Sequence, residues 1–338
     1  MALFKLVTWK EIQDNFADCL LLGNGASIAI DRKFAYHSLL DEARASKYVT
    51  HEIDQLFQHF QTQDFEHILR MVWNTYHVNQ ALGINEKRTL QVYSQTREAL
   101  IKVVQRIHVS YDETQPYLPK ISQYLKHFNT IISLNYDLIV YWAFLLANKS
   151  DQSVRFKDCF LSGEFDYEWK RLRESIAPVN RSILVFYPHG NLVLATGLLG
   201  GTIKIARQDV NEYLIDRILA QWKSGKVNPL FVSEGESSQK VEAILRNSYL
   251  STVYNSVLCE NKDSIAIYGW SVSDNDDHIL KALLASGVRR IAVSVYAANE
   301  NWQYYCHHVD QKIQNLVKGQ RQIEVVFYDS ASEGCWNS

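Results

Sequence analysis

Three short segments of the chain combine residue types that could handle a nucleotide. Residues 23–27 read Gly-Asn-Gly-Ala-Ser, residues 135–137 read Asn-Tyr-Asp, and residues 188–190 read Pro-His-Gly. Glycines in a turn allow the backbone to approach a phosphate closely. An amide, a carboxylate and an imidazole can orient a sugar, position a water and accept a proton. Together the segments indicate a site that binds a nucleotide and acts on it.

Each segment follows an apolar run that predicts a buried β-strand. Because the runs are continuously apolar, they are typical of parallel strands covered on both faces. The runs occupy residues 20–23, 130–134, 183–187, 230–233, 265–269, 291–296 and 323–328, with helical patterns at 137–147, 238–258 and 277–285. The sequence therefore predicts an α/β fold, a doubly wound, Rossmann-like parallel sheet whose strand ends bring the three segments together.

The gap between the first two strands, residues 40–128, is too long for one crossover and contains helical patterns at residues 65–76 and 90–109. We predict a helical insertion within a single α/β domain that spans residues 1–338. Its aromatic residues either fill a helical core, which is the favoured reading, or form a surface for an oligomer or partner. These residues include Phe57, Phe60, Phe65, Trp73 and Tyr76. A second irregular stretch, residues 192–207, predicts a β-hairpin.

Composition excludes several classes of protein. The formal net charge of -2 offers no electrostatic footprint for nucleic acid. Five cysteines without a C-x-x-C pair give neither a zinc site nor a disulfide framework. The longest apolar run, residues 138–147, is far shorter than the roughly 20 residues that cross a bilayer. We expect a cytoplasmic protein that binds neither membranes nor metal.

Each of the three segments also has a structural interpretation. Residues 23–27 lack the third glycine of the Rossmann fingerprint, since Ile28 stands there, and they could form a tight turn without a ligand. Asp137 could cap a helix. His189 could be structural, although its place between Pro188 and Gly190 suits a general base. The remaining histidines, His307 and His308 among them, receive no role.

A fourth segment, residues 269–278, again follows a predicted strand. Gly269, Ser271 and Ser273 almost match a serine-hydrolase nucleophile elbow, but the last glycine is missing. We interpret the segment as a turn over the adenosine half of a dinucleotide. The acidic residues 274–277 would then favour the start of the following helix.

The segments resemble motifs of the sirtuin superfamily. Residues 23–27 are similar to its Gly-Ala-Gly-Ile-Ser loop, residues 135–137 to its Asn-x-Asp element, and residues 188–190 to its catalytic His-Gly turn. Residues 228–235 and 269–271 come where sirtuins carry a strand with its loop and then a Gly-Thr-Ser turn that contacts the cofactor. The order along the chain also agrees.

Two sirtuin features are missing. Residues 30–36 replace the Pro-Asp-Phe-Arg segment, and the four-cysteine zinc module is absent from the sequence. These departures argue against protein deacylation and are similar to the pattern of bacterial sirtuin-like domains that hydrolyse NAD in anti-phage defence. Residues 229–235 and 269–279 resemble an uncharacterised bacterial family within that group, the domain-of-unknown-function family 4917.

The resemblance implies that NAD is the substrate and that no metal is needed. Asn135 would bind the nicotinamide ribose or position a water, Asp137 would orient the carboxamide or the ribose, and His189 would be the general base. The pyrophosphate would lie on the glycine loop. The residues implied to contact NAD are Gly23, Asn24, Gly25, Ala26, Ser27, Ser233, Gly269 and Ser271.

This resemblance predicts an NAD glycohydrolase that releases nicotinamide and ADP-ribose. It further implies a regulated effector of anti-phage defence, acting by NAD depletion in abortive infection and restrained as a homo-oligomer or by a regulatory partner. One alternative is an ADP-ribosyl transferase or cyclase with the same oxocarbenium chemistry. Another is a non-catalytic sensor of NAD or an ADP-ribose derivative. The presence of both Asn135 and His189 argues against a sensor, because binding alone needs only the glycine loop.

Overall fold

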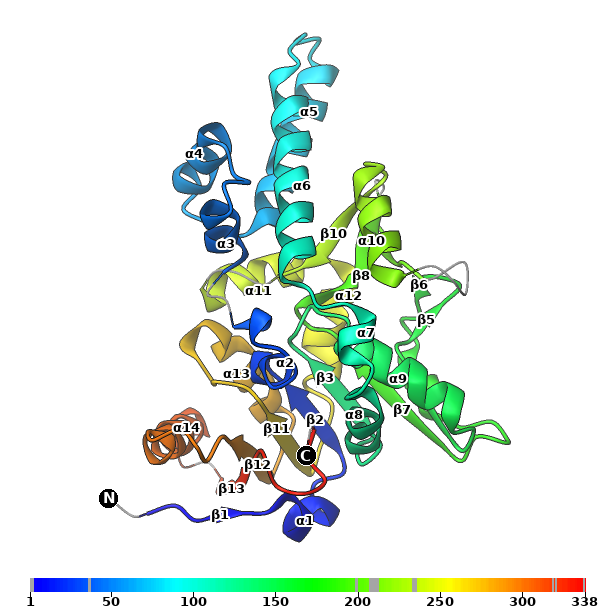
Figure 1. Cartoon of the computed structure of the whole chain (residues 1–338), viewed down its shortest axis with the longest axis vertical. Coiled ribbons are helices and arrows are strands. Elements are labelled where there is room, and N and C mark those ends of the chain that lie inside the picture. The colour runs from blue at the N-terminus through cyan, green and yellow to red at the C-terminus, as the bar shows by residue number, and fades with distance from the viewer. Residues whose placement is uncertain are drawn as a thin grey trace.

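The computed structural model describes residues 3–35, 38–197, 200–206, 213–232, 236–317, 319, 321–336 and 338. These residues form an eight-stranded sheet in the order β1-β13-β12-β11-β2-β3-β7-β4, with every neighbouring pair parallel (Figure 1). The predicted α/β fold with a parallel sheet is confirmed. Its strands are β1 (Leu6–Val7), β2 (Cys19–Leu22), β3 (Thr130–Ser133), β4 (Val154–Lys157), β7 (Arg181–Phe186), β11 (Ser264–Tyr268), β12 (Arg290–Val295) and β13 (Glu324–Asp329).

Both faces of this sheet are covered. In β2, Leu20 and Leu22 pack into one apolar cluster, which includes residues of α8 (Leu118–Leu125) and α9 (Ile139–Ser150). The alternate residues Cys19 and Leu21 pack into a second cluster with α13 (Asp277–Ala285) and α14 (Trp302–Val317). Successive strand residues point to opposite faces, so a strand buried on both sides must be apolar at every position. This explains the continuous apolar runs.

The central strand β2 lies at the point where the chain changes direction across the sheet. Leu22 pairs with Ser133 of β3 on one side and with Tyr268 of β11 on the other. After β2, the chain forms β3, β4 and β7 on one side of β2 and then crosses to form β11, β12 and β13 on the other side. Ligand sites in such sheets form outside the carboxyl ends of the strands at this switch point.

The described residues also form a five-stranded antiparallel sheet in the order β10-β8-β9-β6-β5. Its strands are β5 (Phe160–Leu161), β6 (Glu164–Phe165), β8 (Gly190–Gly197), β9 (Thr202–Lys204) and β10 (Val227–Phe231). The pairing of β8 with β9 confirms the predicted hairpin. The interpretation of residues 230–233 as a strand of the parallel sheet is wrong. Pro229 has no N–H to donate and therefore suits β10 as an edge strand of the smaller sheet.

Helices fill the stretch between β2 and β3. They are α2 (Asn24–Ile28), α3 (Leu39–Ala45), α4 (His51–His59), α5 (Phe65–Ala81), α6 (Arg88–Ile107), α7 (Tyr111–Thr114) and α8. The long helices α5 and α6 project together away from the sheet (Figure 1). Phe57 and Phe65 are buried and meet edge to face, so these two rings belong to a core, whereas Phe60 is exposed. The assignment of residues 40–128 as an insertion within a single domain remains a proposal.

The remaining helices are α1 (Trp9–Ile12), α10 (Leu214–Lys223), α11 (Ser237–Leu245) and α12 (Ser248–Thr252). The single helix predicted over residues 238–258 is wrong, because the side chain of Asn247 accepts the N–H of Leu250 and starts α12 separately. Within the described part of the chain, we find no helix with the length and apolar character needed to cross a bilayer.

Candidate active site

A cavity of about 880 Å³ opens at the carboxyl ends of the parallel strands. Its wall includes one residue or more from the loop after each of six strands: Gly23 after β2, Asn135 after β3, His189 after β7, Gly269 after β11, Tyr296 after β12 and Ser330 after β13. A volume of this size is within the usual range for sites that hold small molecules and cofactors. The strand ends therefore produce one shared cavity rather than separate turns.

The glycine loop after β2 packs against the loop after β11. The N–H of Gly23 donates to Tyr268 O at 3.0 Å, and the N–H of Gly25 donates to Gly269 O at 2.6 Å. A Cβ at Gly23 would lie 2.6 Å from Trp270 Cα, which is closer than any side chain can approach. These glycines thus permit two backbones to touch.

This packing changes the roles expected of the loop. The N–H groups of Gly23 and Gly25 already have protein acceptors, and that of Ala26 donates to Gly23 O. Ala26 and Ser27 do not line the cavity, whereas Gly23, Asn24 and Gly25 do. The expectation that Ala26 and Ser27 contact a pyrophosphate is not supported by this arrangement, because both lie behind the cavity wall.

Asn135 is held by the glycine loop. Its Nδ2 donates to Gly23 O at 3.0 Å and to Ser27 Oγ at 2.9 Å. The carbonyl oxygen of Gly23 can only accept, so the amide nitrogen must face it. The Oδ1 atom has no hydrogen-bond partner among the described residues and remains available to a ligand in the cavity that Asn135 lines.

Asp137 closes the same network. Ser27 Oγ donates to Asp137 Oδ2, while Oδ1 accepts the N–H of Ile139 at 2.8 Å at the start of α9. Burial raises the pKa of Asp137, although both hydrogen bonds favour the carboxylate. Asp137 lines the cavity, but its two oxygens already have donors. The capping interpretation therefore describes its contacts better than direct binding of a ribose or carboxamide.

Replacing Ser27 with alanine tests this network. The change leaves Asp137 Oδ2 without its donor and removes one acceptor of Asn135 Nδ2. We expect Ser27→Ala to lower the free energy of unfolding by about 1–3 kcal/mol, measured by denaturant titration. Ser94→Ala on the exposed face of α6 is the matched control, with an expected change within about 0.5 kcal/mol. Equal effects of the two changes would contradict the network.

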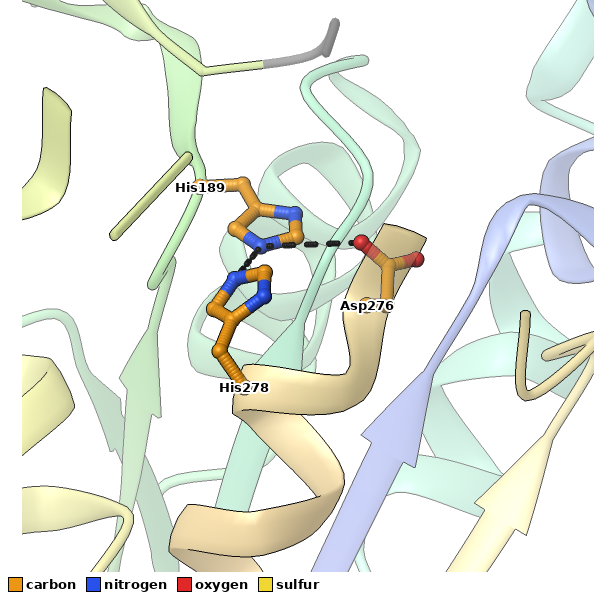
Figure 2. Close-up of side chains that lie close together, drawn as sticks. All are labelled: His189, Asp276 and His278. Carbon is orange, nitrogen blue, oxygen red and sulfur yellow. Dashed lines mark hydrogen bonds and ion pairs between the residues drawn. The ribbon is translucent and has the colours of Figure 1, made fainter. Parts of the chain in front are cut away.

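His189 faces a second histidine that is distant in the sequence. Its Nε2 lies 3.0 Å from Nε2 of His278, the second residue of α13, and 4.0 Å from Oδ1 of Asp276 (Figure 2). Both rings are buried. Burial lowers the pKa of His189 to about 3 and that of His278 to about 4, because an imidazolium would lose its hydration. Both imidazoles are therefore neutral near pH 7.

Asp276 is the charged member of this group. Its Oδ1 accepts from Lys240 Nζ at 2.8 Å, and its Oδ2 accepts from Trp270 Nε1 at 3.3 Å. Burial opposes ionisation of Asp276, but its attraction to a protonated His189 and to Lys240, together with these hydrogen bonds, lowers its pKa to about 2. Asp276 directly precedes α13, as expected for an acidic helix start, but its carboxylate accepts from Lys240 and Trp270 rather than from an N–H group of the helix.

His189, Asp276 and His278 could also suit a metal ion. One ligand atom of each lies within 4.8 Å of the others, and two histidines with one carboxylate is a known set for transition metals. Lys240, however, places its ammonium on the Asp276 oxygen that faces His189. The ammonium of Lys240 thus supplies a positive charge where a metal ion would bind. That the protein needs no metal remains a prediction.

The buried histidines predict a pH-dependent stability. Both folded-state pKa values lie below the ordinary value of about 6.5, so the unfolded chain binds more protons and stability falls as pH drops below 6.5. Between pH 7 and pH 5, we expect His189 and His278 together to remove about 3–4 kcal/mol. Denaturant titrations of the His189→Gln, His278→Gln double variant should lack this loss. A double variant with the wild-type pH dependence would contradict it.

Of the remaining predicted residues, Gly269 and Ser271 line the cavity, and Ser233 lies outside the described residues. Sequence reasoning missed several wall residues. They include the cation Lys240, the acid Asp276, and the aromatic residues Phe34, Trp270, Tyr296, Trp302 and Tyr305. Two of them were marked in the sequence, because Trp270 directly follows a predicted strand and Tyr296 is the last residue of another.

The fold and the cavity define an α/β protein with a ligand-sized site at the switch point of its parallel sheet. The chain belongs to the family described as domain of unknown function DUF4917, whose profile matches residues 20–336. A solved structure described as "Structural Basis for the Mechanism and Regulation of Sir2 Enzymes" is similar to it, with 10% sequence identity and a TM-score of 0.34. That match covers 91% of this chain and 96% of the other. No curated protein matches the sequence.

Proposed function

We propose that the protein is an NAD glycohydrolase that cleaves the bond between nicotinamide and ribose. The observation that carries the proposal is the meeting of Asn135 and His189 in one cavity at the switch point. The volume of about 880 Å³ suits a dinucleotide. The sequence motifs around these two residues are similar to sirtuin motifs, which supports NAD as the nucleotide.

In this proposal, the free Oδ1 of Asn135 accepts a hydrogen bond from the attacking water or a ribose hydroxyl. The glycosidic bond breaks, its electron pair leaves with nicotinamide, and an oxocarbenium-like ribose remains. Water adds to the ribose carbon and gives its proton to Nδ1 of His189, an atom without a hydrogen-bond partner among the described residues. General-base assistance of this kind contributes about 10²- to 10⁴-fold in rate.

Other wall residues receive supporting roles. We assign the pyrophosphate to Arg32, because its guanidinium can pair with phosphate oxygens and the N–H groups of Gly23, Gly25 and Ala26 already have acceptors. Tyr296 and Trp302 offer ring faces to the adenine. Asp137 and Ser27 hold Asn135 and the start of α9 in place.

The biological role follows from the resemblance alone. We propose a cytoplasmic effector of anti-phage defence that depletes NAD, restrained as a homo-oligomer or by a regulatory partner. Because most of the aromatic residues first considered for such a surface are buried or half-buried, the contact area is expected elsewhere. Light scattering of the purified protein, alone and with NAD, measures the assembly.

Product analysis separates hydrolysis from its alternatives. The protein is incubated with NAD in H₂¹⁸O with EDTA present, and the products are analysed by mass spectrometry. A glycohydrolase gives nicotinamide and ADP-ribose that carries ¹⁸O. A cyclase gives a cyclic product without ¹⁸O, and a transferase gives an ADP-ribosylated acceptor without ¹⁸O only when an acceptor is added. Calorimetric binding of NAD without any product would indicate a sensor and contradict the proposal.

A further inference from the structure

His278 lies between two hollows of the molecule. On one side, its Nε2 meets His189, which lines the NAD cavity. On the other side, His278 lines a second hollow of about 720 Å³ together with Ser237, Tyr254 and Lys281. His278 itself is 3% exposed, whereas Ser237 is half-buried at the edge of the protein. The histidine pair thus connects the buried site with a hollow closer to solvent.

The hydrogen bonds along this connection form a line. A neutral imidazole has one donor and one acceptor nitrogen, so the 3.0 Å contact between the two Nε2 atoms requires a proton on one of them. Nδ1 of His278 then lies 3.1 Å from Ser237 Oγ. Ser237 Oγ also accepts the backbone N–H of His278 at 3.1 Å, which fixes the hydroxyl beside the ring. Each imidazole can therefore accept a proton at one nitrogen and release one at the other.

The charged groups around His278 do not replace it as the hydrogen-bond partner of His189. Asp276 Oδ1 is 4.0 Å from Nε2 of His189, too far for a hydrogen bond, and it is paired with Lys240. Asp277, on the same helix as His278, pairs with Lys281 at 3.8 Å and with Lys312 at 2.7 Å. The ring of Tyr254 lies 6.0 Å from that of His278. Within the described residues, His278 is the group in hydrogen-bonding contact with His189 Nε2.

Hydrolysis of NAD releases a proton in the buried site, which these hydrogen bonds can carry away. The nicotinamide ring is cationic in NAD and leaves neutral, so the water that adds to the ribose leaves one proton behind in each turnover. A proton that stayed on His189 would place a charge on a buried ring. The site therefore requires an exit for one proton per turnover.

We propose that His278 and Ser237 carry this proton from His189 to the second hollow, an inference that rests on the proposed hydrolysis. Water gives a proton to Nδ1 of His189, and the proton on Nε2 of His189 passes to Nε2 of His278. The proton on Nδ1 of His278 passes by way of Ser237 to water in the second hollow. No net charge remains on either ring. His278 acts through His189 and is a positioning residue rather than a catalytic one.

The first test replaces His278 with glutamine. The glutamine oxygen can accept a hydrogen bond from His189 and keep that ring in place, but a carboxamide cannot pass a proton. We expect His278→Gln to lower kcat for nicotinamide release about 10-fold or more, with KM and calorimetric NAD affinity unchanged. His127→Gln, at the opposite ends of the strands, is the control and should retain wild-type kcat. An unchanged kcat in His278→Gln would overturn the proposal.

A second variant separates proton transfer from packing. His278→Ala leaves space beside the second hollow, and added imidazole should restore kcat in proportion to its concentration. Loss of activity without rescue, in a variant that still binds NAD, would overturn the relay and leave a packing role. In ¹⁵N NMR of the wild-type protein, a scalar coupling between the two Nε2 atoms is expected, and its absence would overturn the shared proton. A wild-type protein that binds NAD without releasing nicotinamide contradicts the proposed function instead. In that case the scalar coupling still tests whether the two histidines share a proton.

Discussion

Replacing His189 with alanine is expected to reduce nicotinamide release from NAD by about 10²- to 10⁴-fold, the usual contribution of a general base. The ring is held at Nε2 by His278, and its Nδ1 is free to accept a proton from water. No other imidazole lines the cavity within the described residues, so no second ring there can take over this step. The measurement is kcat by chromatography of nicotinamide.

A matched substitution distinguishes this effect from a general loss of structure. His127→Ala removes a half-buried histidine near Trp9 and Phe128, away from the cavity, and should retain kcat. NAD affinity of His189→Ala, measured by calorimetry, should stay close to the wild-type value, because the base acts in the transition state. A His189→Ala variant with wild-type kcat would remove His189 from the mechanism.

Replacing Gly269 with alanine is expected to destabilise the protein by about 2–5 kcal/mol, from backbone strain and from overlap. Gly269 has a φ of +68°, which strains any residue with a Cβ. A Cβ there would collide with the nitrogen of Ala26 and lie 2.6 Å from the carbonyl carbon of Gly25. The contact between the two loops would open, and Asn135 would lose its anchor at Gly23. Loss of NAD binding should accompany the loss of stability.

Gly83→Ala isolates the backbone strain. Gly83 has a similar φ of +71°, but a Cβ there would have no atom within 4 Å. We therefore expect Gly83→Ala to cost only about 1–2 kcal/mol and to leave NAD binding unchanged. Both values come from denaturant titration. Equal costs for the two variants would show that the close approach of the loops contributes nothing.

The sheet could be predicted from the sequence because a parallel strand covered on both faces must be apolar throughout. The runs that contain Leu21, Ile132 and Ile267 show this pattern, and all three side chains are buried. The small sheet was harder to predict, because β10 is also apolar and only Pro229 marks it as an edge strand. The break before α12 depends on one side-chain hydrogen bond of Asn247, which periodicity does not register.

The site was predictable where a residue directly follows a strand. Asn135, His189 and Gly269 line one cavity because parallel strands end at the same edge. Lys240 and His278 lie on helices, and His278 is 89 positions from His189, so only the folded topology brings them together. The sequence also could not indicate that the hydroxyl of Ser27 donates to Asp137 and that Ser27 does not line the cavity.

The most direct test of the account is nicotinamide release by the purified protein. Wild type, Asn135→Ala and His189→Ala are each incubated with NAD, and nicotinamide and ADP-ribose are quantified by chromatography. We expect equal amounts of both products from the wild type and almost none from either variant, although His189→Ala still binds NAD. Wild-type protein that neither binds nor cleaves NAD, or variants that release nicotinamide at the wild-type rate, would contradict it.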